Sequence, residues 1–200
     1  MSGRRRPLPE VADSQQPPPG DPEQPPGDPV AVARAICLRL LTQRARSRSE
    51  LADALARRGV PDDAATGVLD RFTEVGLIDD TALAETLAGA QHRERGLARR
   101  AVAAKLRQRG LDDDTVRSAL TGIDRDSERA RAQELVARRR RSLSGLPPQV
   151  QARRLVGLLA RKGYAPGLAY EVVRGELAGV SEQELGDLPA EAPEEQRDPF

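Results

Sequence analysis

Apolar residues recur along this chain at helical spacing, in a pattern that repeats about every 50 residues. Each copy has one apolar series before a glycine-containing phrase and another after it. The series are Leu51/Leu55 with Ala65/Val68/Leu69, Val102/Leu106 with Val116/Ala119/Leu120, and Leu155/Leu159 with Ala169/Val172/Val173. Such spacing is typical of amphipathic helices, and such a period is typical of helical repeat proteins. No segment alternates with period two for long enough to form a strand, so the sequence predicts an all-α fold.

The phrase between the two series ends in glycine in all three copies. It reads Leu-Ala-Arg-Arg-Gly59, Leu-Arg-Gln-Arg-Gly110 and Leu-Ala-Arg-Lys-Gly163, with the glycines 51 and 53 residues apart. Each glycine follows the last residue of a helical series, where a left-handed helix C-cap favours a residue without Cβ. We therefore expect a positive φ at Gly59, Gly110 and Gly163.

The pattern predicts three helices in each repeat. They cover residues 30–43, 47–58 and 62–75, then 80–93, 97–109 and 113–123, then 126–142, 147–162 and 166–177. Ser47 and Glu50 have the spacing of a capping box at the start of a helix. We assign three-helix repeats to residues 30–78, 79–123 and 124–179. Because a unit of this size buries little apolar surface alone, the repeats should stack into an elongated, curved array.

The two ends of the chain differ from the repeats in composition. Residues 1–29 contain 9 of the 16 prolines and predict a disordered, proline-rich arm, and residues 180–200 predict a disordered acidic tail. The overall charge is +1, but residues 30–179 carry 28 basic and 19 acidic residues, a net charge of +9, whereas the arm carries −2 and the tail −6. A basic body indicates a polyanionic or acidic partner, with tails that compete for the same surface.

Little in the sequence suggests catalysis. The single histidine, His92, is expected at the surface, and the single cysteine, Cys37, lies on an apolar stripe and is expected to be buried. No phosphate-binding glycine loop or nucleophile elbow occurs, and the Asp79-Asp80 and Asp112–Asp114 clusters are explained by helix N-termini rather than by a metal. We therefore expect no enzymatic activity, no metal and no cofactor.

The location of the protein also follows from the sequence. No apolar run approaches the roughly 20 residues of a membrane span, and no signal peptide follows Arg4–Arg6. A single cysteine cannot form an intrachain disulfide, which fits a reducing compartment. We expect a cytoplasmic, monomeric protein without membrane contact.

Basic clusters are the stronger functional signal. Four consecutive arginines, Arg138–Arg141, fan over about 300° of a helix, so some must point away from the core whatever their purpose. A solvated surface is the ordinary explanation, but basic residues also precede the capping glycine in every repeat, which favours a stripe that binds phosphates or an acidic protein. The candidate binding residues are Arg57, Arg58, Arg93, Arg95, Arg99, Arg100, Lys105, Arg107, Arg109, Arg138, Arg139, Arg140, Arg141, Arg153, Arg154, Arg161 and Lys162.

Four segments of the chain resemble one family of bacterial regulatory proteins. They are Ser49-Glu50-Leu51 with Leu55 and Arg57-Arg58-Gly59; Val75-Gly76-Leu77-Ile78-Asp79-Asp80; Arg95-Gly96 with Arg99, Lys105-Leu106 and Gly110; and Leu159-Ala160-Arg161-Lys162-Gly163-Tyr164. Over residues 31–177 the chain resembles the RecX family. The resemblance implies tandem three-helix repeats that bind the RecA recombinase filament along its groove and inhibit its ATPase, strand exchange and coprotease activities. Some members of the family also bind DNA.

The chain departs from that family at two places. Leu83 and Leu87 stand where the family usually has aromatic residues, and Leu97 stands where it favours proline. The proline-rich arm lies outside the family pattern. Two other functions remain open at this point: a sequence-nonspecific DNA-binding protein with helix-turn-helix-like units, which would bind single- or double-stranded DNA directly, and a helical-repeat scaffold.

Overall fold

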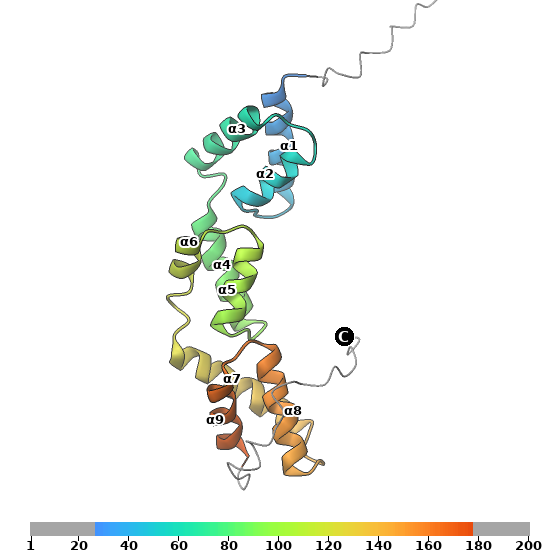
Figure 1. Cartoon of the computed structure of the whole chain (residues 1–200), viewed down its shortest axis with the longest axis vertical. Coiled ribbons are helices and arrows are strands. Elements are labelled where there is room, and N and C mark those ends of the chain that lie inside the picture. Colours follow the sequence, from blue (N-terminus) through green and yellow to red (C-terminus); the bar gives the residue numbers. More distant parts are fainter. Residues whose placement is uncertain (1–26, 178–200) are drawn as a thin grey trace, which may run out of the picture.

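The computed structural model describes residues 27–177, and within this range the regular structure consists of nine helices without a strand. The helices form three groups that follow one another along the long axis of the molecule, from the blue first group to the orange-red third group (Figure 1). This elongated, all-helical array of three-helix repeats confirms the fold class predicted from the sequence. Apart from residues 27–29, the predicted arm and tail lie outside the described residues.

Each group of three helices encloses its own apolar cluster. The helices are α1 (Pro29–Gln43), α2 (Arg48–Ala56) and α3 (Asp62–Glu74); α4 (Asp80–Arg93), α5 (Arg99–Gln108) and α6 (Asp113–Ala119); and α7 (Arg125–Arg141), α8 (Pro148–Arg161) and α9 (Pro166–Glu176). The clusters consist mostly of leucine, valine and alanine. Cys37 belongs to the first cluster and is fully buried, as expected, and burial raises the pKa of its thiol.

Polar side chains begin the helices as the sequence pattern predicts. The Oγ of Ser47 accepts a hydrogen bond from the Glu50 amide at 3.1 Å, and the Glu50 carboxylate accepts one from the Ser47 amide at 3.0 Å. This pair is the predicted capping box. Asp79 and Asp112 likewise accept bonds from amides in the first turns of α4 and α6. These contacts satisfy backbone donors that have no partner inside a helix.

The three phrase-ending glycines have the predicted left-handed conformation. Their φ values are +70° at Gly59, +71° at Gly110 and +87° at Gly163. The helices that they follow, α2, α5 and α8, are the second helices of the three repeats. At both junctions between repeats, the C-terminal end of one second helix lies on the first turn of the second helix of the preceding repeat. This order places the negative end of one helix dipole against the positive end of the next.

Junction 1–2 joins the end of α5 to the start of α2. The Oγ of Ser47 donates a hydrogen bond to the carbonyl oxygen of Arg109 at 2.5 Å. The Arg109 guanidinium reaches both carboxylate oxygens of Glu50, with N–O distances of 2.5 and 3.2 Å. The carboxylate of Asp80 accepts a bond from the Arg48 amide at 3.0 Å. Asp80 begins α4, as the sequence pattern predicts, and its carboxylate also caps the first turn of α2 in the first repeat.

Junction 2–3 joins the end of α8 to the start of α5. The Ala98 amide donates to the carbonyl oxygen of Lys162 at 2.9 Å, and the Nζ of Lys162 donates to the carbonyl oxygen of Arg95 at 2.6 Å. The buried Tyr164 donates from its hydroxyl to the carbonyl oxygen of Gly96 at 3.1 Å. Burial raises the pKa of Tyr164 to about 12, so this hydroxyl keeps its proton at neutral pH.

The two junctions leave no room for a side chain at the glycines between the repeats. A Cβ on Gly110 would lie 2.2 Å from the Oγ of Ser49, and a Cβ on Gly163 would lie 2.7 Å from the Cβ of Ala101. A Cβ on Gly59 would meet nothing within 4 Å, because no other described repeat packs against this end of α2. The repeated glycine therefore ends a helix in all three copies and permits close contact between repeats in two of them.

The expectation that His92 lies at the surface is wrong. His92 is 7% exposed, and its Nδ1 lies 2.8 Å from the carbonyl oxygen of Leu97, to which it donates a hydrogen bond. The connection from α4 to α5 turns at Gly96, which has a φ of +64°, and folds back over the end of α4. The sequence places His92 at a polar helix end, and only this return of the chain buries it.

Candidate partner-binding surface

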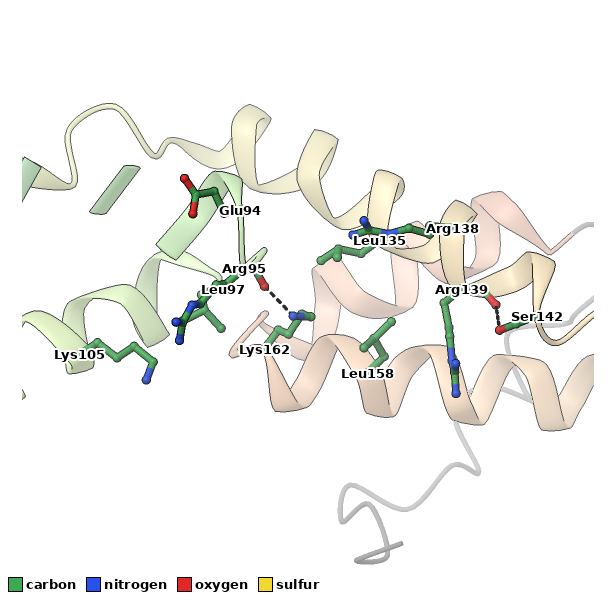
Figure 2. A pocket seen from close by; sticks show the side chains of 10 residues that line it. All are labelled: Glu94, Arg95, Leu97, Lys105, Leu135, Arg138, Arg139, Ser142, Leu158 and Lys162. Carbon is green, nitrogen blue, oxygen red and sulfur yellow. Dashed lines mark hydrogen bonds between the residues drawn. The ribbon is translucent and has the colours of Figure 1, made fainter. Parts of the chain in front are cut away.

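A cleft with a volume of ≈ 730 Å³ lies at junction 2–3. The α4–α5 connection and α5 form one wall, and α7 and α8 form the other. Figure 2 shows Lys105 and Arg95 at one end of the cleft, Lys162 and Leu158 in the middle, and Arg139 at the other end. We call this site the basic cleft; its lining residues are Glu94, Arg95, Leu97, Lys105, Leu135, Arg138, Arg139, Ser142, Leu158 and Lys162.

The charge of the basic cleft is largely uncompensated. Five of its ten lining residues are cationic, whereas Glu94 is the only acid. The side chains of Arg138 and Arg139 are exposed and have no hydrogen-bond or ion-pair partner among residues 27–177. Cationic groups gathered without counter-charges attract an anionic partner. The cleft is therefore the strongest candidate for a binding surface.

Lys162 shows the effect of this charge. Its Nζ is fixed by the bond to the Arg95 carbonyl, which Figure 2 marks by a dashed line. Burial lowers the pKa of Lys162, and the positive charges of Arg131 and Arg138 lower it further. An anion in the cleft would oppose this repulsion and raise the pKa again.

A second cleft of ≈ 550 Å³ also lies at junction 2–3, but its cations have acidic neighbours. Arg107 forms an ion pair with Asp113 at 2.7 Å. Arg99 donates from its amide to the Glu128 carboxylate and from its guanidinium to the carbonyl oxygen of Ile123. The Arg107 ion pair lies within the second repeat, and the Arg99 bond to Glu128 joins the second repeat to the third, so the second cleft is a weaker candidate for an anionic partner.

The other predicted binding residues lie apart from the basic cleft. Arg57 and Arg58 are exposed in the first repeat, and Arg58 donates to the carbonyl oxygen of Ala54. Arg140 faces Glu176 at 3.7 Å. The remaining residues are exposed on α4, α5, α7 and α8: Arg93, Arg100, Arg141, Arg153, Arg154 and Arg161.

The predicted stripe of basic residues before the capping glycines is altered by the junctions. Arg109 is only 21% exposed, and its guanidinium contacts Glu50 and the carbonyl oxygen of Ala45 in the first repeat. Lys162 is held by the α4–α5 connection. Both residues stabilise the junctions between repeats, because the helix ends that carry them are the surfaces on which the repeats meet. Lys162 also lines the basic cleft, whereas Arg109 does not.

Sequence reasoning missed the leucines that line the basic cleft and one further cation near Lys162. Leu97, Leu135 and Leu158 line the cleft between the basic residues. Arg131 lies close enough to Lys162 to lower its pKa. A signal existed on α7, because Arg131, Leu135 and Arg138 are spaced by four and three residues and therefore share one helix face.

Two further classes of site are absent from the described part of the chain. Residues 27–177 contain no group of three or more His, Cys, Asp or Glu side chains that could hold a metal ion. None of the helices described here is long and apolar enough to cross a membrane.

Comparison with known proteins identifies each of the three repeats. Residues 33–72 match the family model described as the first three-helix domain of RecX, residues 79–120 match the second, and residues 126–173 match the third. The three matches together cover more than half of the chain.

Relatives of the chain carry the name regulatory protein RecX. The protein from Thermobifida fusca is 53% identical over 167 residues, which are 84% of this chain and 90% of the relative. The protein from Streptomyces coelicolor is 48% identical and covers 82% and 88% of the two chains. The protein from Mycobacterium tuberculosis is also 48% identical and covers 76% and 89%.

Two solved structures share the fold. The crystal structure of RecX from Lactobacillus salivarius aligns with a TM-score of 0.66 at 17% identity and covers 79% of this chain and 97% of that one. A second crystal structure of a regulatory protein RecX aligns with a TM-score of 0.64 at 22% identity, covering 74% and 72%.

Proposed function

The chain belongs to the RecX family of regulatory proteins, and from this premise we propose that it binds RecA nucleoprotein filaments and inhibits their ATPase, strand-exchange and coprotease activities. In this role it is a non-enzymatic, cytoplasmic regulator of DNA repair and recombination that acts as a monomer. The basic cleft is the observation that supports the proposal most directly. Its five cations come from two repeats and lack acidic partners, which suits an acidic protein surface.

The shape of the array suits a filament. A protein extended along one axis can contact neighbouring protomers of a helical assembly at once (Figure 1). A molecule bound across protomers would hinder the movements that accompany ATP turnover, and it would cap or destabilise growing ends. Because one regulator acts on several protomers, inhibition requires fewer regulators than RecA subunits.

ATP hydrolysis by RecA on single-stranded DNA tests this proposal. We expect inhibition to saturate well below one regulator per RecA subunit and to persist when excess single-stranded DNA is added. Inhibition that appears only when the protein coats the DNA, and that disappears with added DNA, would contradict the proposal. It would favour a protein that competes with RecA for DNA.

Nonspecific DNA binding is the second candidate function, supported by the exposed arginines of α7. Arg138, Arg139 and Arg141 are exposed without an ion-pair partner within residues 27–177. In a plot of log affinity against log salt concentration, neutralising the run Arg138–Arg141 should reduce the slope by about 0.9 for each arginine that contacts a phosphate. An unchanged slope would exclude these residues from phosphate contacts.

A further inference from the structure

The basic cleft combines two features that together define the chemistry of its occupant. Its rim carries the cations Arg95, Lys105, Arg138 and Arg139, and its floor carries Leu97, Leu135 and Leu158. A nucleic-acid backbone would use the cations but would leave the half-buried side chains of Leu97 and Leu158 uncovered. A peptide with carboxylates on both sides of apolar side chains would use both.

The chain itself contains such a peptide directly after the described residues. Residues 181–188 read Ser-Glu-Gln-Glu-Leu-Gly-Asp-Leu. Glu182, Glu184 and Asp187 supply three carboxylates, and Leu185 and Leu188 supply two apolar side chains. No basic residue interrupts this segment, so its composition complements both the rim and the floor of the cleft.

The described part of the chain ends on α9, which packs against α7, one of the helices that form the cleft. Glu176, at the end of α9, lies 3.7 Å from Arg140 of α7 in an ion pair. Arg140 directly follows Arg138 and Arg139, which line the cleft. Six residue steps separate Glu176 from Glu182, and an extended chain advances about 3.3 Å per residue, or roughly 20 Å in total. With this reach, a segment that starts beside α7 can extend across the face of α7 that carries Arg138 and Arg139.

We propose that residues 181–188 bind in the basic cleft of their own chain and compete there with acidic partners. The carboxylates would face the rim cations, and the two leucines would cover the apolar floor. A partner would then have to displace the segment before it could occupy the cleft. The regulatory consequence for RecA rests on the proposed function, whereas the contact itself does not.

The two lysines of the chain permit a direct test. They are Lys105 and Lys162, and both line the basic cleft. A zero-length carbodiimide joins carboxylates to amines, so cross-links to lysine in the full-length protein report only on this cleft. We expect mass spectrometry to find Glu182, Glu184 or Asp187 joined mainly to Lys105. The Lys105 side chain is exposed, whereas the Lys162 amine donates a hydrogen bond to the carbonyl oxygen of Arg95.

The proline-rich arm provides the matched negative control. It contains acidic residues such as Glu10, Asp13 and Asp21 and precedes the first repeat in the sequence, whereas the basic cleft lies between the second and third repeats. Equal cross-linking of arm and tail, or none from the tail, would overturn the proposal. Cross-links between isotopically distinct copies in a mixed sample would also overturn it. Leu185→Ser with Leu188→Ser keeps the charge and should reduce the yield; an unchanged yield would exclude the apolar part of the contact.

Competition with a polyanion tests the consequence without RecA. A tethered segment has an effective concentration of about 1 mM, so a weak contact with a Kd of about 0.3 mM would reduce the affinity of a competitor about fourfold. The full-length variant E182Q/E184Q/D187N should therefore bind oligothymidylate about fourfold more tightly. The arm variant E10Q/D13N/D21N, with the same change in charge, should bind like the unaltered chain. If both variants gained the same affinity for oligothymidylate, the change in net charge alone would explain the effect. That result would contradict the proposal, whatever the outcome with RecA.

Discussion

Alanine substitutions at the repeated glycines separate the contribution of a repeat junction to stability from the contribution of the helix cap. Gly59 and Gly110 have nearly the same φ, +70° and +71°, but they differ in what surrounds them. A Cβ meets open space at Gly59 and the side chain of Ser49 at Gly110. Alanine therefore imposes the same backbone strain at Gly59 and at Gly110. Of these two substitutions, only Gly110→Ala also disturbs a junction.

The expected magnitudes follow from this difference. A left-handed conformation costs a residue with a Cβ about 1–2 kcal/mol, so Gly59→Ala should lower the free energy of unfolding by that amount. At Gly110, the overpacking at 2.2 Å from the Oγ of Ser49 adds about 1–3 kcal/mol. Gly163→Ala should also exceed Gly59→Ala, because Ala101 lies 2.7 Å from the new Cβ.

A double-mutant cycle isolates the contact at Gly110. Ser49→Gly removes the side chain that the new Cβ would meet, at a cost of about 0.5–1 kcal/mol for glycine in a helix. The double variant Gly110→Ala/Ser49→Gly should therefore recover the additional loss at Gly110, which gives a coupling energy of about 1–3 kcal/mol. Urea unfolding followed by circular dichroism measures all four proteins. Equal losses for Gly59→Ala and Gly110→Ala, with no coupling to Ser49, would refute the described junction.

Three further predictions concern one half-buried and two buried groups. Burial alone would raise the pKa of Glu50, but hydrogen bonds from Arg109, Ser47 and Arg44 hold it below its usual value. Such a carboxylate stabilises the fold above its ordinary pKa and loses this contribution as the pH falls through the folded pKa. In the Glu50→Gln variant, the free energy of unfolding measured with urea should therefore fall less steeply as the pH drops below about 4.5. Tyr164→Phe leaves the Gly96 carbonyl without its donor and should lower the free energy of unfolding by about 1 kcal/mol, measured by the same method. Cys37 is fully buried and should react with a thiol reagent only at the rate of unfolding; fast labelling of the native protein would contradict its place in the first core.

The local structure of the chain could be predicted from its sequence, because helix formation and capping depend on neighbouring residues. The apolar spacing, the Ser47–Glu50 capping box and the left-handed glycines are all local signals, and the structure contains each of them. The long-range contacts could not be predicted in this way. Nothing near Arg109 in the sequence indicates that it binds Glu50, 59 residues away. The burial of His92 likewise depends on how the chain returns at Gly96.

The candidate site was predictable in composition but not in arrangement. Arg95, Lys105, Arg138, Arg139 and Lys162 all belong to clusters that the sequence identifies. Their meeting in one cleft depends on how the third repeat docks on the second, and the repeat pattern does not specify that geometry. The leucines of the cleft floor resemble ordinary core positions in the sequence, and Leu135 does belong to the third core, so only the structure shows that they also line the cleft.

The binding of charge-reversed variants to RecA filaments tests the central claim most directly. Arg138→Glu with Arg139→Glu alters two exposed residues of the basic cleft, and Arg34→Glu with Arg39→Glu makes the same change in charge on exposed positions of α1. Each protein carries a fluorescent label, and anisotropy is measured with RecA assembled on oligothymidylate. We predict that the cleft variant loses about tenfold or more in affinity and that the α1 variant stays within about twofold of the unaltered chain. Equal losses in both variants, or none in the cleft variant, would contradict the assignment of the basic cleft as the filament-binding surface.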